Sequence, residues 1–307
     1  MRPLACLIAA GIAVFAFSAN AATLAYGEAF DTLYRIDLSA RTATAIGSAG
    51  FYGGVPIANI SGLTTTANGT LYAAAGASKL FVGIDPATGQ AHVIGSLNSA
   101  GQGSGQFNAL DLGMASDCDG TLWLASGTLK QLWKVDPATG ATSLVGSTGA
   151  PIAGLVSHAG ALYGSGSGGD HGFYRIDKKT AAATLIGDFG AAASSILNSV
   201  AMSFAPDGTL WAVLNYVPPT TGSVTPDWSD LATIDPATGK MTLLGPITGP
   251  ASLRQIGMKG FTAGPTQCQA TASDPVGAPI GSPWALTLLG MLLAAFGLAG
   301  SRRHLRA

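Results

Sequence analysis

The sequence predicts an all-β protein, a five-bladed β-propeller closed by a 3+1 exchange of strands. Three observations carry this prediction. The pentapeptide Asp-Pro-Ala-Thr-Gly occurs at residues 85–89, 136–140 and 235–239, and each copy lies between two apolar stretches. Degenerate copies begin at Asp37 and Asp177, so five aspartates follow one another at spacings of roughly 40–60 residues, a period typical of propeller blades. The 43 glycines and only 10 % charged residues suit short strands and tight turns.

Each repeat contains the same elements in the same order. An apolar A strand leads into an Asn-Gly or Asp-Gly turn, which supplies the positive φ that a two-residue hairpin needs. A B strand, a variable loop and a C strand follow, and the Asp-Pro-Ala-Thr-Gly turn leads into a D strand that ends in glycine. The expected A strands span 62–66, 109–115, 153–157 and 199–204, and the expected C strands end at Asp37, Asp85, Asp136, Asp177 and Asp235.

The two ends of the repeat region lack complete blades. Residues 23–26 match a B strand with no A strand before them, and residues 253–262 match an A strand with no B strand after them. We therefore expect the C-terminal A strand to complete the first blade, which closes the ring and removes an exposed sheet edge. The predicted propeller domain spans residues 22–264.

The repeated aspartates are interpreted as turn residues rather than as a binding site. Aspartate accepts hydrogen bonds from backbone N–H groups two residues further on, proline fixes the next φ, and glycine takes the left-handed position that closes the hairpin. Five equal turns around a ring cannot converge on one small ligand. The run Asp117-Cys118-Asp119-Gly120 is likewise interpreted as an A–B turn, because a calcium loop needs further ligands and a bidentate glutamate. No metal site is predicted.

Both ends of the chain predict export. Residues 1–21 combine Arg2, an apolar run and the small residues Ala19-Asn20-Ala21, which is the pattern of a cleavable signal peptide. At the other end we expect a linker over 265–283, a transmembrane helix over 284–300 and a basic cytoplasmic tail over 301–307. A plain C-terminal anchor is one interpretation of this arrangement.

A more specific pattern lies in the same segment, P-x-x-S-x-W-A-L-x-L-L-G followed by apolar residues and Arg-Arg. It resembles the exosortase-type C-terminal sorting signals of Gram-negative bacteria, the PEP-CTERM and IPTL-like tails. The sequence Pro279-Ile280-Gly281-Ser282 stands where those tails have Pro-Glu-Pro or Ile-Pro-Thr-Leu. The matching positions are Pro279, Ser282, Trp284, Arg302 and Arg303. The resemblance implies a processing protease in the membrane as partner, and a precursor that is anchored in the inner membrane before it reaches the cell surface or the extracellular space.

The charge balance argues against a nucleic acid partner. Removal of both ends takes away four of the 15 basic residues and none of the 16 acidic ones, so the remaining chain has a net charge of −5. A nucleic-acid-binding protein would carry a basic face.

Two cysteines remain in the exported chain, Cys118 and Cys268. An oxidising compartment makes a disulfide the default, and neither CxxC spacing nor nearby histidine suggests zinc. In a propeller the A–B and C–D turns share one face, which we call the turn face, and the B–C and D–A loops share the other, which we call the rim. Cys118 is expected in an A–B turn, and Cys268 follows the closing A strand, which leaves on the same face. A Cys118–Cys268 disulfide is therefore predicted.

The rim carries the residues that turn geometry does not demand, and these are the candidate ligand-binding residues. Asp, Asn, Tyr and Trp around a funnel suit a carbohydrate or another small polar ligand, while an ordinary solvated loop face is the alternative. The B–C loops supply Glu28, Asp31, Asp170, His171, Tyr216, Asp227, Trp228 and Asp230. The D–A loops and the starts of the A strands supply Asn59, Asn108, Asp111, Asn198 and Arg254, together with Phe51 and Tyr52.

No catalytic residue and no cofactor are assigned. Paired carboxylates for glycoside hydrolysis would have to come from Glu28, the sole glutamate, and Asp111. No serine lies in a G-x-S-x-G elbow, and the chain has neither a P-loop nor a dinucleotide fingerprint. The sequence thus favours a non-catalytic binding module. The resemblance of the tail to exosortase-type signals implies a matrix module at the cell surface with glycan or exopolysaccharide as ligand. The alternatives are a hydrolase of extracellular polymer that uses rim carboxylates, and a purely structural surface protein.

Overall fold

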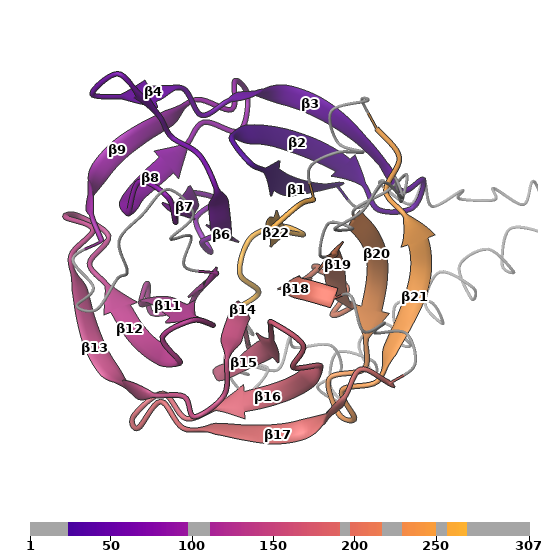
Figure 1. Cartoon of the computed structure of the whole chain (residues 1–307). Coiled ribbons are helices and arrows are strands. Elements are labelled where there is room, and N and C mark those ends of the chain that lie inside the picture. The colour runs from indigo at the N-terminus through magenta and orange to yellow at the C-terminus, as the bar shows by residue number, and fades with distance from the viewer. Residues whose placement is uncertain (1–23, 98–110, 191–196, 217–228, 250–256, 269–307) are drawn as a thin grey trace, which may run out of the picture. The chain divides into compact units, whose positions relative to one another are not determined.

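The computed structural model describes residues 24–97, 111–190, 197–216, 229–249 and 257–268. Five four-stranded antiparallel sheets surround a central axis in this part of the chain, which confirms the five-bladed propeller (Figure 1). The chain divides into two units, residues 1–268 and 269–307. The propeller belongs to the first unit. The predicted signal peptide, linker, membrane helix and basic tail lie wholly or largely outside the described residues, among which no helix is long and apolar enough to cross a membrane.

The strands follow the predicted order from the axis outward. Blade 1 consists of β22 (Gly260–Thr262), β1 (Leu24–Ala29), β2 (Thr32–Asp37) and β3 (Thr42–Ser48). Blade 2 consists of β6 (Ile60–Thr65), β7 (Leu71–Ala75), β8 (Leu80–Ile84) and β9 (Ala91–Ser96). Blade 3 consists of β10 (Leu112–Ser116), β11 (Leu122–Ser126), β12 (Gln131–Val135) and β13 (Thr142–Ser147). Blade 4 consists of β14 (Ile152–His158), β15 (Ala161–Gly166), β16 (Gly172–Ile176) and β17 (Ala183–Asp188). Blade 5 consists of β18 (Leu197–Phe204), β19 (Leu210–Tyr216), β20 (Ser229–Ile234) and β21 (Met241–Pro246).

Blade 1 is closed by the C-terminal strand, as the 3+1 exchange predicts. Strand β22 pairs antiparallel with β1, with Thr262 opposite Tyr26 and Gly260 opposite Glu28. The outer strands add a second closure, because Thr248 forms a parallel bridge with Thr42 and accepts a 2.7 Å hydrogen bond from the amide of Ala43. The ring is therefore joined at both its inner and its outer edge.

The Asp-Pro-Ala-Thr-Gly segments form C–D turns, which confirms their interpretation as turn residues. A carboxylate oxygen of Asp85 accepts hydrogen bonds from the amide of Ala87 at 2.8 Å, and Gly89 has a φ of 77°. The hydrogen bond from the amide of Ala87 and, with a smaller effect, the one from the hydroxyl of Thr88 hold the pKa of Asp85 below its usual value. The degenerate turn at Asp177 keeps the same geometry, with Ala181 at a φ of 70°.

The C–D turn of each such blade also packs against the blade before it, at a glycine near the end of that blade's D strand. A Cβ atom on Gly95 would overlap the carbonyl oxygen of Thr139, in the turn of the next blade, and one on Gly187 would overlap that of Thr238. Glycine is thus needed because the turn of one blade docks on the outer strand of the blade before it. The repeat encodes contacts between blades as well as turns within them.

The axis of the ring is filled. Equivalent positions of the inner strands hold Gly62, Gly113, Gly154, Ala201 and Gly260. A Cβ atom on Gly113 would meet the backbone of the neighbouring inner strand, so small residues allow the close approach. The space on the axis, lined by side chains such as Leu63, Met114 and Phe261, has a volume of only about 10 Å³. A space of this volume holds at most about one water molecule, so the axis of the described propeller is not a ligand site.

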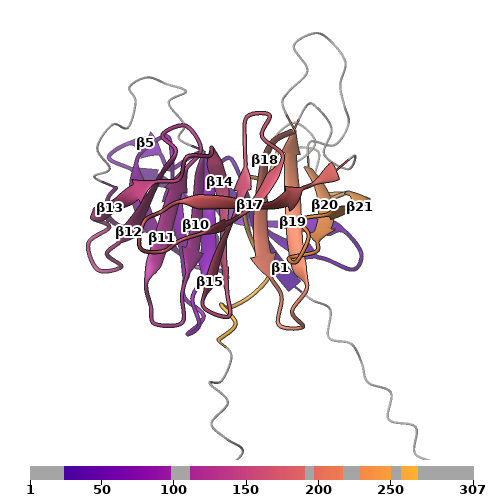
Figure 2. The same ribbon diagram turned by 90° about the horizontal axis from the view of Figure 1, so that it is seen from below.

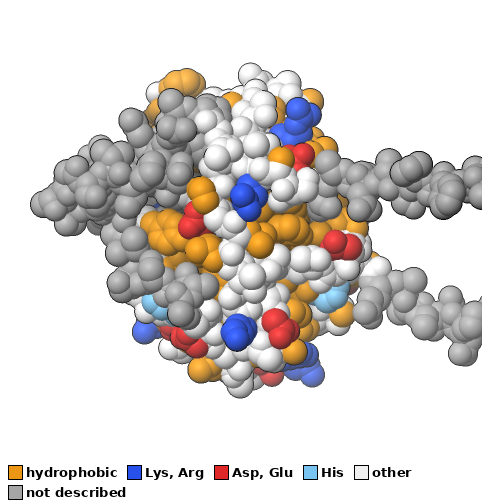
Figure 3. All heavy atoms as spheres, turned by 90° about the vertical axis from the view of Figure 1, so that its right-hand side faces the viewer, with side chains coloured by type: hydrophobic (Ala, Val, Ile, Leu, Met, Phe, Trp, Pro, Cys, Tyr) orange, Lys and Arg blue, Asp and Glu red, His pale blue; other side chains and the backbone are white. Residues whose placement is uncertain are grey.

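Figure 2 shows the ring edge-on, with the strands running between the two faces. Figure 3 shows the outer side of the ring where β21 lies, and there single charged side chains lie among hydrophobic and uncharged groups without a broad field of one sign. Several of the exposed leucines occupy equivalent D-strand positions, one per blade: Leu144, Leu185 and Leu243.

Candidate functional site

The structure describes nine of the thirteen predicted rim residues. Asn108, Asp227, Trp228 and Arg254 lie outside the described residues. The nine others come from the B–C connections or from the rim ends of the inner strands: Glu28, Asp31, Asn59, Asp111, Asp170, His171, Asn198, Tyr216 and Asp230. They are spread over all five blades: blades 2 and 3 contribute Asn59 and Asp111 from the starts of their inner strands, and the B–C connections supply residues of blades 1, 4 and 5.

Two rim carboxylates are each bound to a tyrosine of their own blade. The hydroxyl of Tyr216 donates to Asp230 at 2.7 Å, and the hydroxyl of Tyr174 donates to Asp170 at about 3 Å. Burial first, and then the hydrogen bond to Asp170, raises the pKa of Tyr174 to about 12. Burial and Asp230 raise the pKa of Tyr216 in the same way. These pairs order the B–C ends of blades 4 and 5.

The amide and imidazole side chains of the rim are also partly buried. The side-chain amide of Asn198 donates to that of Asn215 at 3.0 Å, which links the inner two strands of blade 5. His171 has a buried Nε2 atom without a hydrogen-bond partner in the part of the chain that the structure describes. Asn59 has a φ of 56°, a left-handed conformation that asparagine adopts more readily than most residues.

An ion pair crosses the rim end of the axis. Lys259, which precedes β22 in blade 1, lies 2.9 Å from the carboxylate of Asp111, which precedes β10 in blade 3. Each side chain keeps about a fifth of its surface exposed, 22 % for Lys259 and 23 % for Asp111. Asp111 is therefore paired, and the sequence reasoning that named it missed Lys259, because the two positions are 148 residues apart.

Glu28 is fully buried in blade 1. The register places it level with Ala74, Ala125 and Val213 in the B strands of other blades, so a carboxyl stands where those blades have small or apolar side chains. Its two carboxyl oxygens have no hydrogen-bond partner among the described residues. Burial, with a smaller contribution from Asp31, raises its pKa well above the usual value. A carboxyl with no exposed surface cannot contact a ligand in this conformation.

The large apolar side chains that are exposed on the described rim lie in blade 1 and in its connection to blade 2. The connection between them forms a short hairpin of β4 (Phe51–Tyr52) and β5 (Val55–Pro56), which we call the aromatic hairpin. Phe30, in the B–C turn of blade 1, is also exposed. Sequence reasoning placed Phe51 and Tyr52 on the rim but missed the hairpin and Phe30. The adjacent glycines 53 and 54 were the signal that could have revealed the turn.

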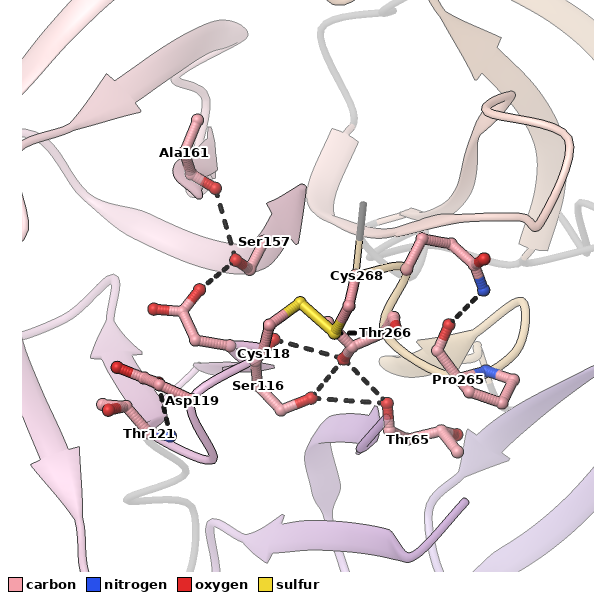
Figure 4. The surroundings of a disulfide bond; sticks show 12 residues. Thr65, Ser116, Cys118, Asp119, Thr121, Ser157, Ala161, Pro265, Thr266 and Cys268 are labelled. Atoms are coloured by element: carbon pink, nitrogen blue, oxygen red, sulfur yellow. Dashed lines mark hydrogen bonds between the residues drawn. A yellow bond between two sulfur atoms is a disulfide. The ribbon is translucent and has the colours of Figure 1, made fainter. Parts of the chain in front are cut away.

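On the turn face, Cys118 and Cys268 form the predicted disulfide, with an S–S distance of 2.09 Å (Figure 4). Thr266 supports it: its backbone amide and its hydroxyl both donate to the carbonyl oxygen of Thr65 at 2.9 Å, and its hydroxyl also donates to the carbonyl of Ser116. The segment that follows the closing strand is therefore tied to blades 2 and 3.

Asp117 next to this disulfide is a structural residue. Its carboxylate accepts hydrogen bonds from the indole N–H of Trp123 at 2.7 Å, from the ammonium group of Lys178 at 2.6 Å and from the hydroxyl of Ser157. These contacts join the A–B turn of blade 3 to blade 4. No group of three or more His, Cys, Asp or Glu side chains that could hold a metal ion occurs among the described residues.

The turn face also has a shallow depression of about 400 Å³ between the A–B turns of blades 2 and 3. It is lined by residues such as Asn68, Asp119 and Pro137, which belong to repeated turns. Its lining is the same turn chemistry that recurs around the ring, so it offers little selectivity for a particular ligand.

No family model and no curated protein matches the sequence. The fold resembles hydrazine synthase from Kuenenia stuttgartiensis, with 18 % identity, 64 % of this chain and 53 % of that chain covered, and a TM-score of 0.40. It also resembles a chain of a nidogen/laminin complex, with 15 % identity, coverages of 80 % and 99 %, and a TM-score of 0.49. Virginiamycin B lyase from Staphylococcus aureus is similar at 14 % identity, coverages of 76 % and 73 %, and a TM-score of 0.41. This chain spans about half the length of the hydrazine synthase chain. No activity follows from likenesses at these identities.

Proposed function

We propose that this protein is an exported propeller that acts as a non-catalytic binding module for extracellular polysaccharide. The observation that carries the proposal is the disulfide between Cys118 and Cys268. Disulfides persist in oxidising compartments, so the bond supports the export that the N-terminal segment predicts. It also fixes which face of the propeller is tied to the C-terminal segment.

The disulfide supports an orientation for the exported protein. The last described residue, Cys268, lies on the turn face, and the rest of the predicted linker and the predicted membrane helix follow it. A precursor anchored by residues 284–300 would therefore be attached through the turn face of the propeller, and the rim would carry no attachment. A processing protease of the exosortase type would then release the propeller with its rim unchanged.

Binding is favoured over hydrolysis by the state of the described rim carboxylates. A glycosidase needs two carboxyl groups that both reach the substrate, one of them with a raised pKa. The carboxyl with a raised pKa is that of Glu28, and it is fully buried. Asp111 is paired with Lys259, and Asp170 and Asp230 accept hydrogen bonds from tyrosines.

Retention on polysaccharide matrices tests this function. The full-length chain is exported in a Gram-negative host, purified with its disulfide intact, and passed over neutral, cationic and acidic polysaccharides while the eluate is assayed for released reducing ends. We expect retention on at least one matrix without release of sugar. Release of reducing ends would identify a hydrolase instead, and absence of retention on every matrix would leave a purely structural protein.

A further inference from the structure

We propose that residues 257–268, which we call the closing segment, act as a redox-controlled latch on the propeller. The closing segment joins the ring reversibly while Cys118 and Cys268 are thiols, and their disulfide locks it in place. This inference goes beyond the proposed binding function, because it concerns how the ring is held closed and requires no ligand. Four observations carry it: a short strand, specific docking contacts, a covalent link at one end and a buried carboxyl under the strand.

The closing segment contributes the shortest inner strand of the described ring. Strand β22 spans three residues and pairs with β1 at three positions, whereas the inner strands of the other four blades span five to eight residues. Figure 1 shows β22 beside the axis, at the inner edge of blade 1. Because the ladder between β22 and β1 is short, main-chain hydrogen bonds alone hold this strand weakly.

Specific contacts place the closing segment without help from the disulfide. Met258 and Phe261 are buried in an apolar cluster that also contains side chains of blades 1 and 5. The amide of Met258 donates to the hydroxyl of Ser229 at 2.7 Å, and the amide of Ala263 donates to the hydroxyl of Ser203 at 2.8 Å. Both hydroxyls belong to blade 5. The reduced chain can therefore dock this segment between the last blade and the first.

In the reduced chain the closing segment has a covalent link to the propeller at one end only. Its N-terminal end leads back to β21, while the residues after Cys268 belong to the second unit of the chain. A segment at the end of a domain that only noncovalent contacts hold opens at a lower free energy than the core strands do. The disulfide to Cys118, in the A–B turn of blade 3, adds a second link, so the segment can no longer leave the ring as a free end.

A buried carboxyl under β22 favours opening. Gly260 stands opposite Glu28 in the register, and a Cβ atom on Gly260 would lie 3.2 Å from the Cβ atom of Glu28, so β22 covers this side chain. The carboxyl oxygens of Glu28 have no hydrogen-bond partner among the described residues. Burying a polar group without a partner costs free energy, which detachment of β22 would recover by admitting water.

The charged groups around Glu28 do not offset this cost. After burial itself, the charge of Asp31 raises the pKa of Glu28 further. Lys259, in the closing segment, lies 2.9 Å from Asp111 instead, and Arg35 of β2 is exposed. Strand β6, which packs against both β1 and β22, contains no titratable side chain. Neither cation is a hydrogen-bond partner of Glu28, so its ionisation is favoured only when the closing segment is detached.

The docked closing segment brings the two cysteines together (Figure 4). The amide of Thr266 donates to the carbonyl of Thr65 and its hydroxyl donates to the carbonyl of Ser116, so Cys268 lies beside the A–B turn of blade 3. In the locking step the two thiols lose two protons and two electrons to an oxidising disulfide, such as that of a thiol–disulfide oxidoreductase, which becomes two thiols. Docking thus favours the bond, and the bond then retains the docked state.

Hydrogen–deuterium exchange of the full-length exported protein, followed by mass spectrometry at neutral pH, tests the latch in three states: oxidised, reduced with dithiothreitol, and reoxidised with oxidised glutathione. One peptide covers the closing segment, and a second covers β8, a middle strand of blade 2, as internal reference. The double variant Cys118→Ser, Cys268→Ser controls for the reductant itself. Glu28→Gln keeps the shape of the buried side chain but cannot ionise, and Asp188→Asn, on the exposed rim of blade 4, is its matched control.

We expect reduction to speed exchange in the closing segment by about tenfold or more while β8 stays protected, and reoxidation to restore slow exchange. The double cysteine variant should exchange as fast as the reduced wild type, with or without reductant. In the closing segment, reduced Glu28→Gln should exchange more slowly than the reduced wild type, and reduced Asp188→Asn should match the reduced wild type.

Unchanged exchange of the closing segment on reduction would overturn the latch, because noncovalent contacts alone would then hold the segment. Equal acceleration in β8 would overturn it as well, because the disulfide would then support the whole propeller. A failure of reoxidation to restore slow exchange would contradict reversible closure. If reduced Glu28→Gln exchanged as fast as the reduced wild type, the opening role of the buried carboxyl would be wrong.

Discussion

The turn face and the rim of this propeller differ in how much of their chemistry repeats and in what their polar groups contact. On the turn face, the same Asp-Pro-Ala-Thr-Gly or related turn recurs in each blade and its carboxylate is satisfied by its own backbone. On the rim, each described blade has a different B–C loop. The exposed side chains there include the aromatic rings of Phe30, Phe51 and Tyr52. Repetition therefore marks what the ring needs in order to close, and the departures from it mark where a ligand can be selected.

The largest predicted effect concerns the disulfide of the turn face. Cys118 and Cys268 are 150 residues apart, and a cross-link over such a loop restricts the unfolded chain strongly. We expect Cys118→Ser, Cys268→Ser to lower the free energy of unfolding by about 3–5 kcal/mol. Urea unfolding of the wild type with and without reductant measures this difference. Reductant should have no effect on the double variant, which is the control. Equal stability of the oxidised wild type and the double variant would show that the segment after β22 stays bound to the propeller without the disulfide.

The next effect concerns the carboxylate beside that disulfide. Asp117 is buried and accepts hydrogen bonds from Trp123 and Lys178 on blades 3 and 4. Removing it leaves the buried indole N–H of Trp123 without its acceptor and takes one of two acceptors from Lys178, which still donates to the carbonyl of Gly160. Asp117→Ala should therefore cost about 2 kcal/mol of stability. Thermal unfolding measures the loss. Asp119→Ala is the control, because Asp119 is exposed in the same turn, and an equally large loss there would mean that the turn, rather than the network, is responsible.

A third prediction concerns the rim side of blade 1 and is one of pH dependence. The folded protein raises the pKa of Glu28 well above its value in the unfolded chain. Between these two pKa values the folded state binds more protons than the unfolded state, so stability falls as pH rises from the unfolded pKa towards the folded one. Glu28→Gln should abolish this part of the fall and be more stable than the wild type at the upper end of that range. Identical pH profiles of the melting temperature would contradict the buried, protonated state.

The smallest predicted effect is that of the ion pair across the rim end of the axis. Asp111 and Lys259 keep part of their surface in contact with water, so solvent screens their attraction. We expect Asp111→Asn to change the free energy of unfolding by less than about 1 kcal/mol. Thermal unfolding of Asp111→Asn and Asp117→Ala in the same assay compares a rim contact with a turn-face contact. A larger loss of stability in Asp111→Asn than in Asp117→Ala would contradict the prediction that the turn-face network contributes more.

Much of the fold could be predicted because it repeats. The spacing of Asp37, Asp85 and Asp136 gave the period, and the unmatched strands at the two ends gave the closure by β22 and the neighbourhood of Cys118 and Cys268. The candidate site could be predicted only as a face. That Asp111 pairs with Lys259, that Asp230 accepts from Tyr216, and that the carboxyl oxygens of Glu28 meet no donor among the described residues depend on side chains brought together from distant positions.

The sequence by itself determined the elements that local chemistry dictates: the turns, the strand order, the five blades and the face on which the closing strand of the propeller ends. These follow from short-range rules, because proline, glycine and aspartate act within four or five residues. Only the tertiary structure decided which rim groups form contacts within the protein and which remain exposed. Burial and pairing depend on the packing of one blade against the next and on contacts across the axis. That packing buries Glu28 and leaves Phe30, Phe51 and Tyr52 in water.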